Sequence, residues 1–146
     1  MELTALYSDK IIEIAGQVPS LDRLEHPDAA ARKTSRICGS VVSVEVALQN
    51  SLVSAYFHEI SACALGQTSA AIVAAHIVGS SCAELRLLHN QVAAMLKTGG
   101  VPPIGKWSDF KYLEPVRTYP ARHASTLLVL DAVVDCLDQI ERRDPV

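Results

Sequence analysis

The chain has 146 residues, of which 49% are hydrophobic and only 5% aromatic, and its formal net charge is −3. This length suits one domain, 1–146, with a core of Ala, Val, Leu and Ile. A negative charge gives no support to nucleic-acid binding, which normally needs a basic face. No apolar run approaches the roughly 18 residues of a membrane span, and the N-terminus lacks a leader pattern. We therefore expect a cytoplasmic protein without membrane contact.

The first part of the chain predicts one helix followed by an irregular segment. Apolar residues recur at helical spacing from Leu3 to Ala15, and Gly16 can end that helix. Residues 17–33 contain two prolines and many charges. We expect them to form an irregular surface segment, with one short turn of helix at Asp28–Arg32.

A β-hairpin is predicted next. Ser40–Leu48 alternates between apolar and polar residues, as in a strand with one buried face. Gln49–Asn50 predicts a tight turn, because Asn tolerates a positive φ. Leu52–Ile60 is the expected return strand. Three of its residues are expected on one face: Val53, Ala55 and Phe57.

The hairpin brings two cysteines together. Residues paired across a hairpin have numbers with a constant sum, which is 99 for a Gln49–Asn50 loop. Cys38 and Cys63 sum to 101, so they are opposed to within two residues, about 7 Å of strand rise. A bulge or a slightly different turn would close that gap. The sequence therefore predicts both cysteines at one end of the hairpin.

Cys63 is expected on a turn between a strand and a helix. Small residues follow it, and the next helix has a buried side made of Leu65, Ile72, Val73 and Ile77. The free N–H groups and the positive dipole end of a helix start favour the thiolate form of a cysteine. The small residues also allow a second element, or an inorganic ligand, to come close.

Two further helices are predicted in the C-terminal half. Ser81 and Glu84 have capping-box spacing, and the helix that follows has an apolar stripe of Leu85, Leu88, Val92, Met95 and Leu96. Val101–Phe110 holds two prolines and a glycine, which predicts a loop. The last helix runs from about Ala121 to Arg142 and places His123 in its first turn. Its stripe is Leu127, Leu130, Val133, Val134, Leu137 and Ile140.

The four cysteines are expected to be free thiols, as in most cytoplasmic proteins. No C-x-x-C or Cys₂His₂ spacing occurs, so any metal site must be assembled from distant segments. Cys82 and Cys136 are expected to have structural roles. The chain has no Ser/His/Asp motif, nucleotide-binding loop or vicinal dithiol, so we expect a protein that is not an enzyme.

Four segments, in chain order, carry motifs of one family. Tyr7–Ile12 is similar to an opening Y-S-x-K-V-I helix, and Cys38-Gly39 stands where the family has C-G-D. Cys63 matches the second ligand segment. Pro115–Leu127 is similar to the third, P-x-[RK]…[HK]-C-[AS]-x-L. Over nearly its whole length, the chain resembles the U-type iron–sulfur cluster assembly scaffolds, which are IscU, SufU and the N-terminal domain of NifU.

The resemblance implies an α+β fold, with a small antiparallel sheet of about three strands packed against four to six helices. It also implies a scaffold that binds iron or a [2Fe–2S] cluster through Cys38, Cys63 and His123. A cysteine desulfurase would donate sulfur, and apo iron–sulfur proteins would receive the cluster. Arg117 and Arg122 have two equally weighted interpretations: a position near this site, where they could attract an anionic partner or persulfide, or an ordinary surface role. A homodimer could supply further ligands.

The chain also departs from the family pattern. The third cysteine of the family falls on Ala124, its aspartate falls on Ser40, and one residue is inserted between Phe57 and Cys63. Two cysteines and one histidine leave a cluster one ligand short. They also suit zinc, for which Cys₂His with water is a known arrangement. An alternative is therefore a degenerate scaffold that binds zinc or no metal and acts through protein–protein contacts.

Overall fold

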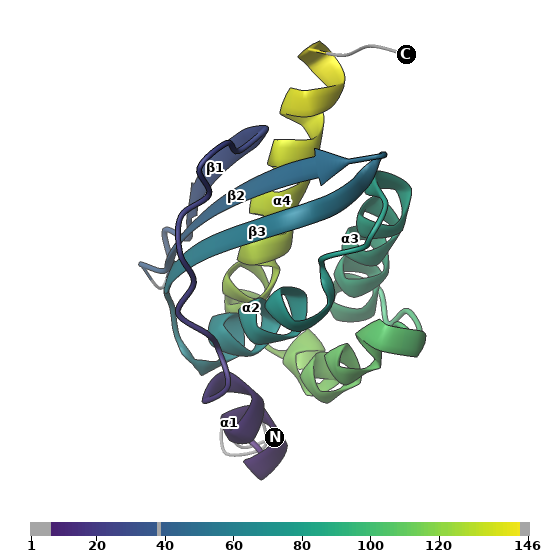
Figure 1. The fold of residues 1–146 in the computed structure, drawn as a ribbon. Coiled ribbons are helices and arrows are strands. Elements are labelled where there is room, and N and C mark those ends of the chain that lie inside the picture. Colours follow the sequence, from purple (N-terminus) through teal and green to yellow (C-terminus); the bar gives the residue numbers. More distant parts are fainter. Residues whose placement is uncertain (1–6, 38, 144–146) are drawn as a thin grey trace.

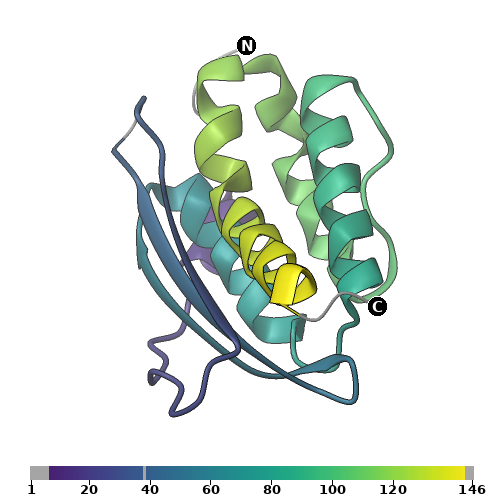
Figure 2. The ribbon, with the colours of Figure 1, turned by 90° about the horizontal axis from the view of Figure 1, so that it is seen from above.

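An antiparallel sheet of three strands lies against a layer of helices (Figure 1). The structure, a computed structural model, describes residues 7–37 and 39–143. In chain order its elements are α1 (Asp9–Ala15), β1 (Ala29–Thr34), β2 (Val41–Gln49), β3 (Leu52–Ser61), α2 (Ala64–His76), α3 (Cys82–Lys97), the 3₁₀ helices η2 (Gly105–Thr118) and η3 (Pro120–Arg122), and α4 (His123–Arg143). The sheet order is β1-β2-β3, and α2, α3 and α4 lie on one side of it (Figure 2). The expected α+β fold is confirmed.

The core lies between the sheet and α4. Three valines of β2 face the helices and are each at most 1% exposed: Val42, Val44 and Val46. Four residues of the predicted α4 stripe are at most 4% exposed: Leu127, Leu130, Val133 and Leu137. Burying one such side chain stabilises the fold by about 1.5–3 kcal/mol. Val134 and Ile140, from the same predicted stripe, are only partly buried. Within the described residues, no helix combines the length and apolar character needed to span a bilayer.

The helix α3 follows its predicted local signals. Ser81 Oγ accepts a hydrogen bond from the backbone N–H of Glu84 at 3.1 Å, so the helix begins at the predicted capping box. All five residues of its predicted stripe are buried, as are the four predicted for α2. Caps and apolar periodicity are local properties of the sequence, and they fix these helices.

The first helix is shorter than predicted. Ser8 Oγ accepts a hydrogen bond from the backbone N–H of Ile11 at 3.3 Å, and α1 therefore begins at Asp9. The predicted start at Leu3 lies outside the described residues. Tyr7, which we included in the helix, precedes the cap and is not helical.

A strand, β1, occupies the segment where we predicted a turn of helix at Asp28–Arg32, so that prediction is wrong. β1 pairs with β2 along its whole length. Lys33 reaches across to α4, where its Nζ lies 3.0 Å from Asp135 Oδ2. The local sequence AAARKT favours a helix, whereas pairing with β2 and packing against α4 impose the strand.

The hairpin turn lies one residue later than predicted. Asn50 and Ser51 have φ values of 55° and 65°, so they form the loop in place of Gln49–Asn50. Paired numbers therefore sum to 101 beside the turn and to 102 beyond a bulge, in place of 99. At the far end of the ladder Val41 pairs with Ser61, two residues before Cys63.

The bulge places the two halves of β3 on different faces. Val53 faces the helices and is 1% exposed, whereas Phe57 lies on the outer face, away from the helices. The prediction that Val53, Ala55 and Phe57 share one face is therefore wrong. Tyr56 and His58 instead take the positions that face the helices. An extra residue in one strand exchanges the two faces of everything beyond it.

A 3₁₀ helix, η2, replaces the second half of the predicted loop Val101–Phe110. Trp107 is 5% exposed, and its Nε1 donates a hydrogen bond to Glu84 Oε2 at 2.8 Å. This contact ties η2 to the first turn of α3. The short η3 then leads into α4, whose first residue is His123.

Residues 17–28 form a strap across the outer face of the sheet (Figure 1). Glu45 of β2 binds this strap to the sheet. Glu45 is 4% exposed, although it belongs to the polar side of the predicted strand. Glu45 Oε2 accepts hydrogen bonds from Arg23 Nε at 3.0 Å and Nη2 at 2.5 Å, and Oε1 accepts one from Leu24 N at 3.0 Å. The Arg23 guanidinium also lies 5.8 Å from the centroid of the Phe57 ring.

A second group of hydrogen bonds joins the strap to β3. His58 is 4% exposed, its Nε2 donates to Pro19 O at 2.9 Å, and the Tyr56 hydroxyl donates to its Nδ1 at 3.3 Å. Burial lowers the pKa of His58 from its usual 6.5, against the opposing effect of the bond to Pro19. The folded protein therefore favours the neutral ring.

The lowered pKa of His58 predicts that the free energy of unfolding decreases in mild acid. The contribution of His58 is fully present above pH 6.5 and is lost as the pH falls from 6.5 to the lower folded-state pKa, because the unfolded chain takes up the proton first. Urea unfolding at pH 7.5 and pH 5.5 should show a larger loss in the wild type than in His58→Gln. The exposed His26, changed to Gln, is the matched control and should leave the pH dependence unchanged. An equal loss in wild type and His58→Gln would contradict this account.

Candidate functional site

Cys63 lies between β3 and α2, as predicted, and is the N-cap residue of α2. Its backbone is extended, with φ −68° and ψ 173°, and its side chain makes no capping hydrogen bond. Cys63 is partly exposed. The Sγ atom is therefore free to contact another group, at a position where the first N–H groups of a helix favour negative charge.

A polar group from the first turn of α4 contacts Cys63. Ser125 Oγ lies 3.8 Å from Cys63 Sγ, and the Ser125 side chain is 1% exposed. The hydroxyl of Ser125 also donates to Arg122 O at 3.2 Å. Ser125 occupies the small [AS] position of the third family motif, but no pattern in the sequence predicted its contact with Cys63.

A glycine allows this close approach. A Cβ atom at Gly66 would lie 2.8 Å from Ala62 Cβ and 3.2 Å from Ser125 O. The start of α2 can therefore pack directly on the backbone of α4 only because residue 66 has no side chain. This confirms that small residues after Cys63 let a second element come close.

His123 is the first residue of α4 and is partly exposed. Its Nε2 lies 3.1 Å from both Val116 O and Arg117 O. A carbonyl oxygen only accepts hydrogen bonds, so Nε2 must carry the hydrogen. In the neutral ring the lone pair is then on Nδ1. Metal-binding histidines are commonly oriented in this way, with one nitrogen bonded to a backbone carbonyl and the other free for the metal.

Three further positions belong to the family motifs, namely Cys38, Ala124 and Ser40. Cys38 lies outside the described residues. Ala124 is exposed on the first turn of α4 and offers no donor atom, while Ser40 is 2% exposed. In the parts of the chain that the structure describes, no three His, Cys, Asp or Glu side chains are grouped to hold a metal ion. The ligand set Cys38, Cys63 and His123 therefore stays a prediction.

The other two cysteines are in different surroundings. Burial raises the pKa of the Cys136 thiol to about 12, and partial burial raises the pKa of Cys82. Both effects oppose formation of a thiolate. Cys136 is fully buried within α4, and Cys82 is the first residue of α3. These surroundings agree with the structural roles expected for both residues.

Two arginines precede the start of α4 in sequence. Arg117 precedes η3 and Arg122 ends it, and backbone carbonyls of both residues bond to side chains of the first turn of α4. Among the described residues, neither guanidinium forms an ion pair. A role of the two arginines at the ligand site stays a prediction.

The packing of α2 on α4 predicts a strong effect at Gly66. Substitution to Ala should lower the free energy of unfolding by about 1–3 kcal/mol, because the new methyl group would overlap Ala62 and crowd the backbone of Ser125. Gly16→Ala is the matched control, since a Cβ there meets only ordinary contacts at 3.4 Å and 3.5 Å. Equal stability of the two variants in urea unfolding would refute the close approach.

Three solved structures share the fold of this chain. The chain is similar to a solved structure described as a nitrogen-fixing NifU-like protein (N-terminal) from Brucella abortus, with a TM-score of 0.93 and 43% identity over 97% of this chain and 98% of that one. Two further structures share the fold at 18% identity, each over 93% of this chain and 99% of its own. One is described as an iron–sulfur cluster assembly scaffold protein for the SUF system from Fervidobacterium islandicum AW-1 (TM-score 0.83), and the other as a hypothetical protein (0.80).

No family model matches the chain, and no curated protein matches it. The identity of 43% extends over nearly all of both chains in the NifU-like comparison, and the fold agrees throughout. This protein therefore belongs to the U-type iron–sulfur cluster assembly scaffold family.

Proposed function

We propose that this protein is a scaffold that holds iron or a [2Fe–2S] cluster in transit, at the place where Cys63 meets the first turn of α4. The observation that carries the proposal is the placement of Cys63. Its Sγ is partly exposed, free of capping bonds and 3.8 Å from a hydroxyl of the neighbouring helix. The 43% identity to a NifU-like domain supports the same function.

The donor atoms suit a cargo that must leave again. A [2Fe–2S] cluster is usually held by four protein ligands. Cys63 offers a thiolate, His123 offers Nδ1, and Cys38 is the further ligand that we propose from the family motif. Ala124 gives nothing in place of the third cysteine. Such a set leaves one position for an outside ligand, so the cluster is held more weakly than in a protein with four cysteines.

The surroundings suit sulfur delivery. We propose that a cysteine desulfurase supplies persulfide sulfur to Cys63 and that apo iron–sulfur proteins take the finished cluster. The backbones of Arg117 and Arg122 contact the first turn of α4, and we propose that their guanidinium groups attract a negatively charged persulfide or cluster. The protein itself makes and breaks no bond of an organic substrate in this scheme, so we propose no enzymatic activity.

Removal of Cys63 tests the proposal directly. Protein reconstituted without oxygen should contain iron and sulfide and show charge-transfer absorption, and Cys63→Ser should lose most of both while keeping its circular dichroism spectrum. Cys82→Ser is the matched control, because Cys82 is also partly exposed at a helix start but has a raised pKa and lies away from α4's first turn. Iron and sulfide unchanged in Cys63→Ser would refute the site. Zinc alone, with no cluster after reconstitution, would favour the degenerate scaffold.

Restoring the missing family ligand should strengthen the site. Ala124 is exposed beside His123, so Ala124→Cys adds a thiolate at the position of the third family cysteine. Loss of the cluster to a chelator should become slower by about tenfold, equivalent to about 1.4 kcal/mol. Ala121→Cys adds an exposed thiol three residues earlier and should leave the rate unchanged. The same slowing in both variants would contradict the placement of the site.

A further inference from the structure

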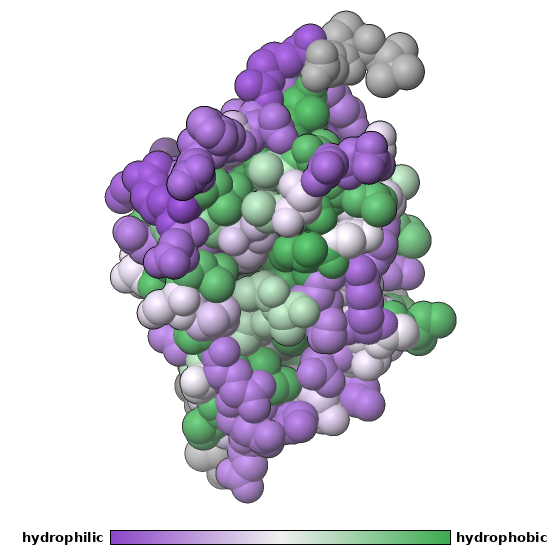
Figure 3. Space-filling view, viewed as in Figure 1, coloured by the Kyte–Doolittle hydropathy of each residue, from purple (hydrophilic) through white to green (hydrophobic). Residues whose placement is uncertain are grey.

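The outer face of the sheet holds a shallow cavity of about 380 Å³ that the proposed function does not use. The strap covers one side of this face, where Arg23, Glu45 and Phe57 contact one another. The other side is open. Figure 3 shows hydrophilic side chains gathered on the β1 side of this face, with hydrophobic side chains in its centre.

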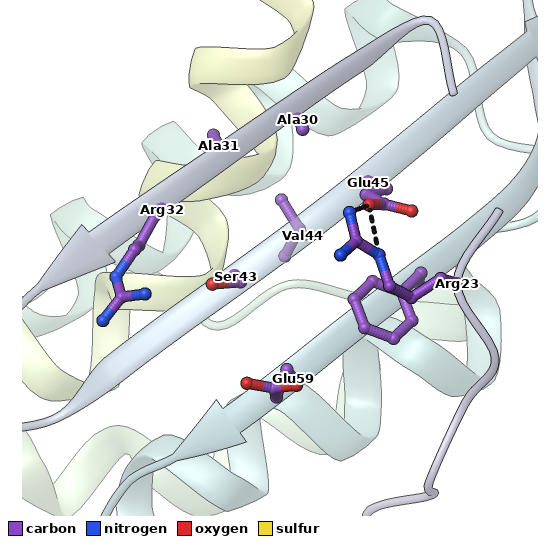
Figure 4. Close-up of a pocket in the computed structure, with 9 residues that line it drawn as sticks. Arg23, Ala30, Ala31, Arg32, Ser43, Val44, Glu45 and Glu59 are labelled. Carbon is purple, nitrogen blue, oxygen red and sulfur yellow. Dashed lines mark hydrogen bonds and ion pairs between the residues drawn. The ribbon is translucent and has the colours of Figure 1, made fainter. Parts of the chain in front are cut away.

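Two opposite charges in the cavity have no partner among the residues that the structure describes. Arg32 on β1, Ser43 on β2 and Glu59 on β3 form one row across the sheet. Arg32 and Glu59 are exposed, and neither forms an ion pair or hydrogen bond with another described residue. Their backbones lie two strand spacings apart, about 10 Å. Figure 4 shows them on either side of Ser43 with no interaction drawn between them.

The neighbouring charged residues form ion pairs within the chain. Arg23 pairs with Glu45 on the same face, and Lys33, the neighbour of Arg32 in sequence, pairs with Asp135 of α4 on the opposite face. The free pair is therefore confined to the row through Ser43. A ligand that fits this row must place a negative group over β1 and a positive group over β3.

A second copy of this chain has that arrangement. Consider a two-fold axis that lies between two facing sheets, nearly parallel to β2. Rotation about it keeps the strand direction and places β3 of each copy over β1 of the other. Arg32 then faces the partner's Glu59, and Glu59 faces the partner's Arg32. We propose that the outer face of the sheet is the interface of a symmetric homodimer held by these two ion pairs.

The surface shape of the outer face also fits the proposed two-fold arrangement. One row further from the end of the ladder, Ala30, Glu45 and Phe57 are aligned across the sheet. Arg23 lies over Phe57 and forms a ridge on the β3 side, while Ala30 is small and exposed on the β1 side. The same rotation sets the ridge of each copy over Ala30 of the other. Charge and shape therefore favour one and the same two-fold arrangement.

The dimer should be weak and sensitive to salt. The strap leaves only part of the outer face free, so the buried area falls below the roughly 1,200 Å² of stable complexes. Exposed ion pairs weaken as salt screens them. The proposal does not depend on cluster binding, because neither Cys63 nor His123 contributes to it. It can therefore fail or hold independently of the proposed function.

A charge exchange tests the dimer. Metal-free, fully reduced wild-type protein should show concentration-dependent association in sedimentation velocity at low salt, reduced at high salt. Arg32→Glu alone and Glu59→Arg alone should each raise the dissociation constant at least tenfold, because each creates two like-charge pairs. An equimolar mixture of the two variants should associate again, since both pairs in the mixed dimer then have opposite charges. Arg142→Glu, an exposed change of the same size on α4, should associate like the wild type.

Three results would overturn the proposal. The first is a wild-type protein that stays monomeric up to millimolar concentration at low salt. The second is association that persists in both single variants, which would assign it to another surface. The third is a mixture of the two variants that fails to associate although each is folded by circular dichroism. Restored association in the mixture cannot come from altered folding, because neither variant has regained its own charge.

Discussion

The candidate site depends on the close approach of two helix starts. α2 begins after Cys63 and α4 begins at His123, and they meet where Gly66 packs on the backbone of Ser125. The start of α2 presents free N–H groups and the positive end of a dipole, whereas the N–H of His123 at the start of α4 is bonded to Pro120 O. The start of α2 thus creates a local preference for negative charge on a protein whose net charge is −3. Thiolates, persulfides and iron–sulfur clusters are all negatively charged, so the packing and the proposed cargo agree.

The pairing of the strands sets the position of Cys63 relative to the start of α4. The bulge in β3 changes the sum of paired residue numbers from 101 to 102, and so sets which residue of β3 is the last to pair. It also turns His58 toward the helices and Phe57 toward the strap. Without the bulge these two faces would be exchanged beyond the turn.

The features that the sequence predicted correctly are those with local causes. The cap at Ser81, the stripe of α3 and the alternation of β2 each depend on neighbours in sequence, and the resemblance supplied the order of the ligand segments. The errors have tertiary causes. β1 is a strand because β2 and Asp135 hold it, although its own residues favour a helix. Glu45 is buried because Arg23 and Leu24 reach it from another segment. The contact between Ser125 and Cys63 spans 62 positions, and no local pattern could reveal it.

The helix α4 connects the site with the proposed interface. Its first turn carries His123, while its later turns hold β1 through Asp135, which pairs with Lys33, and Gln139, whose Nε2 donates to Ala30 O at 2.8 Å. β1 therefore shows its outer face with Arg32 in a fixed position relative to the site. Rotation about an axis parallel to β2 keeps the direction of the strands. In the proposed dimer both Cys63 residues would thus lie at the same end of the assembly, clear of the contact between the sheets, and both sites would stay open toward one side.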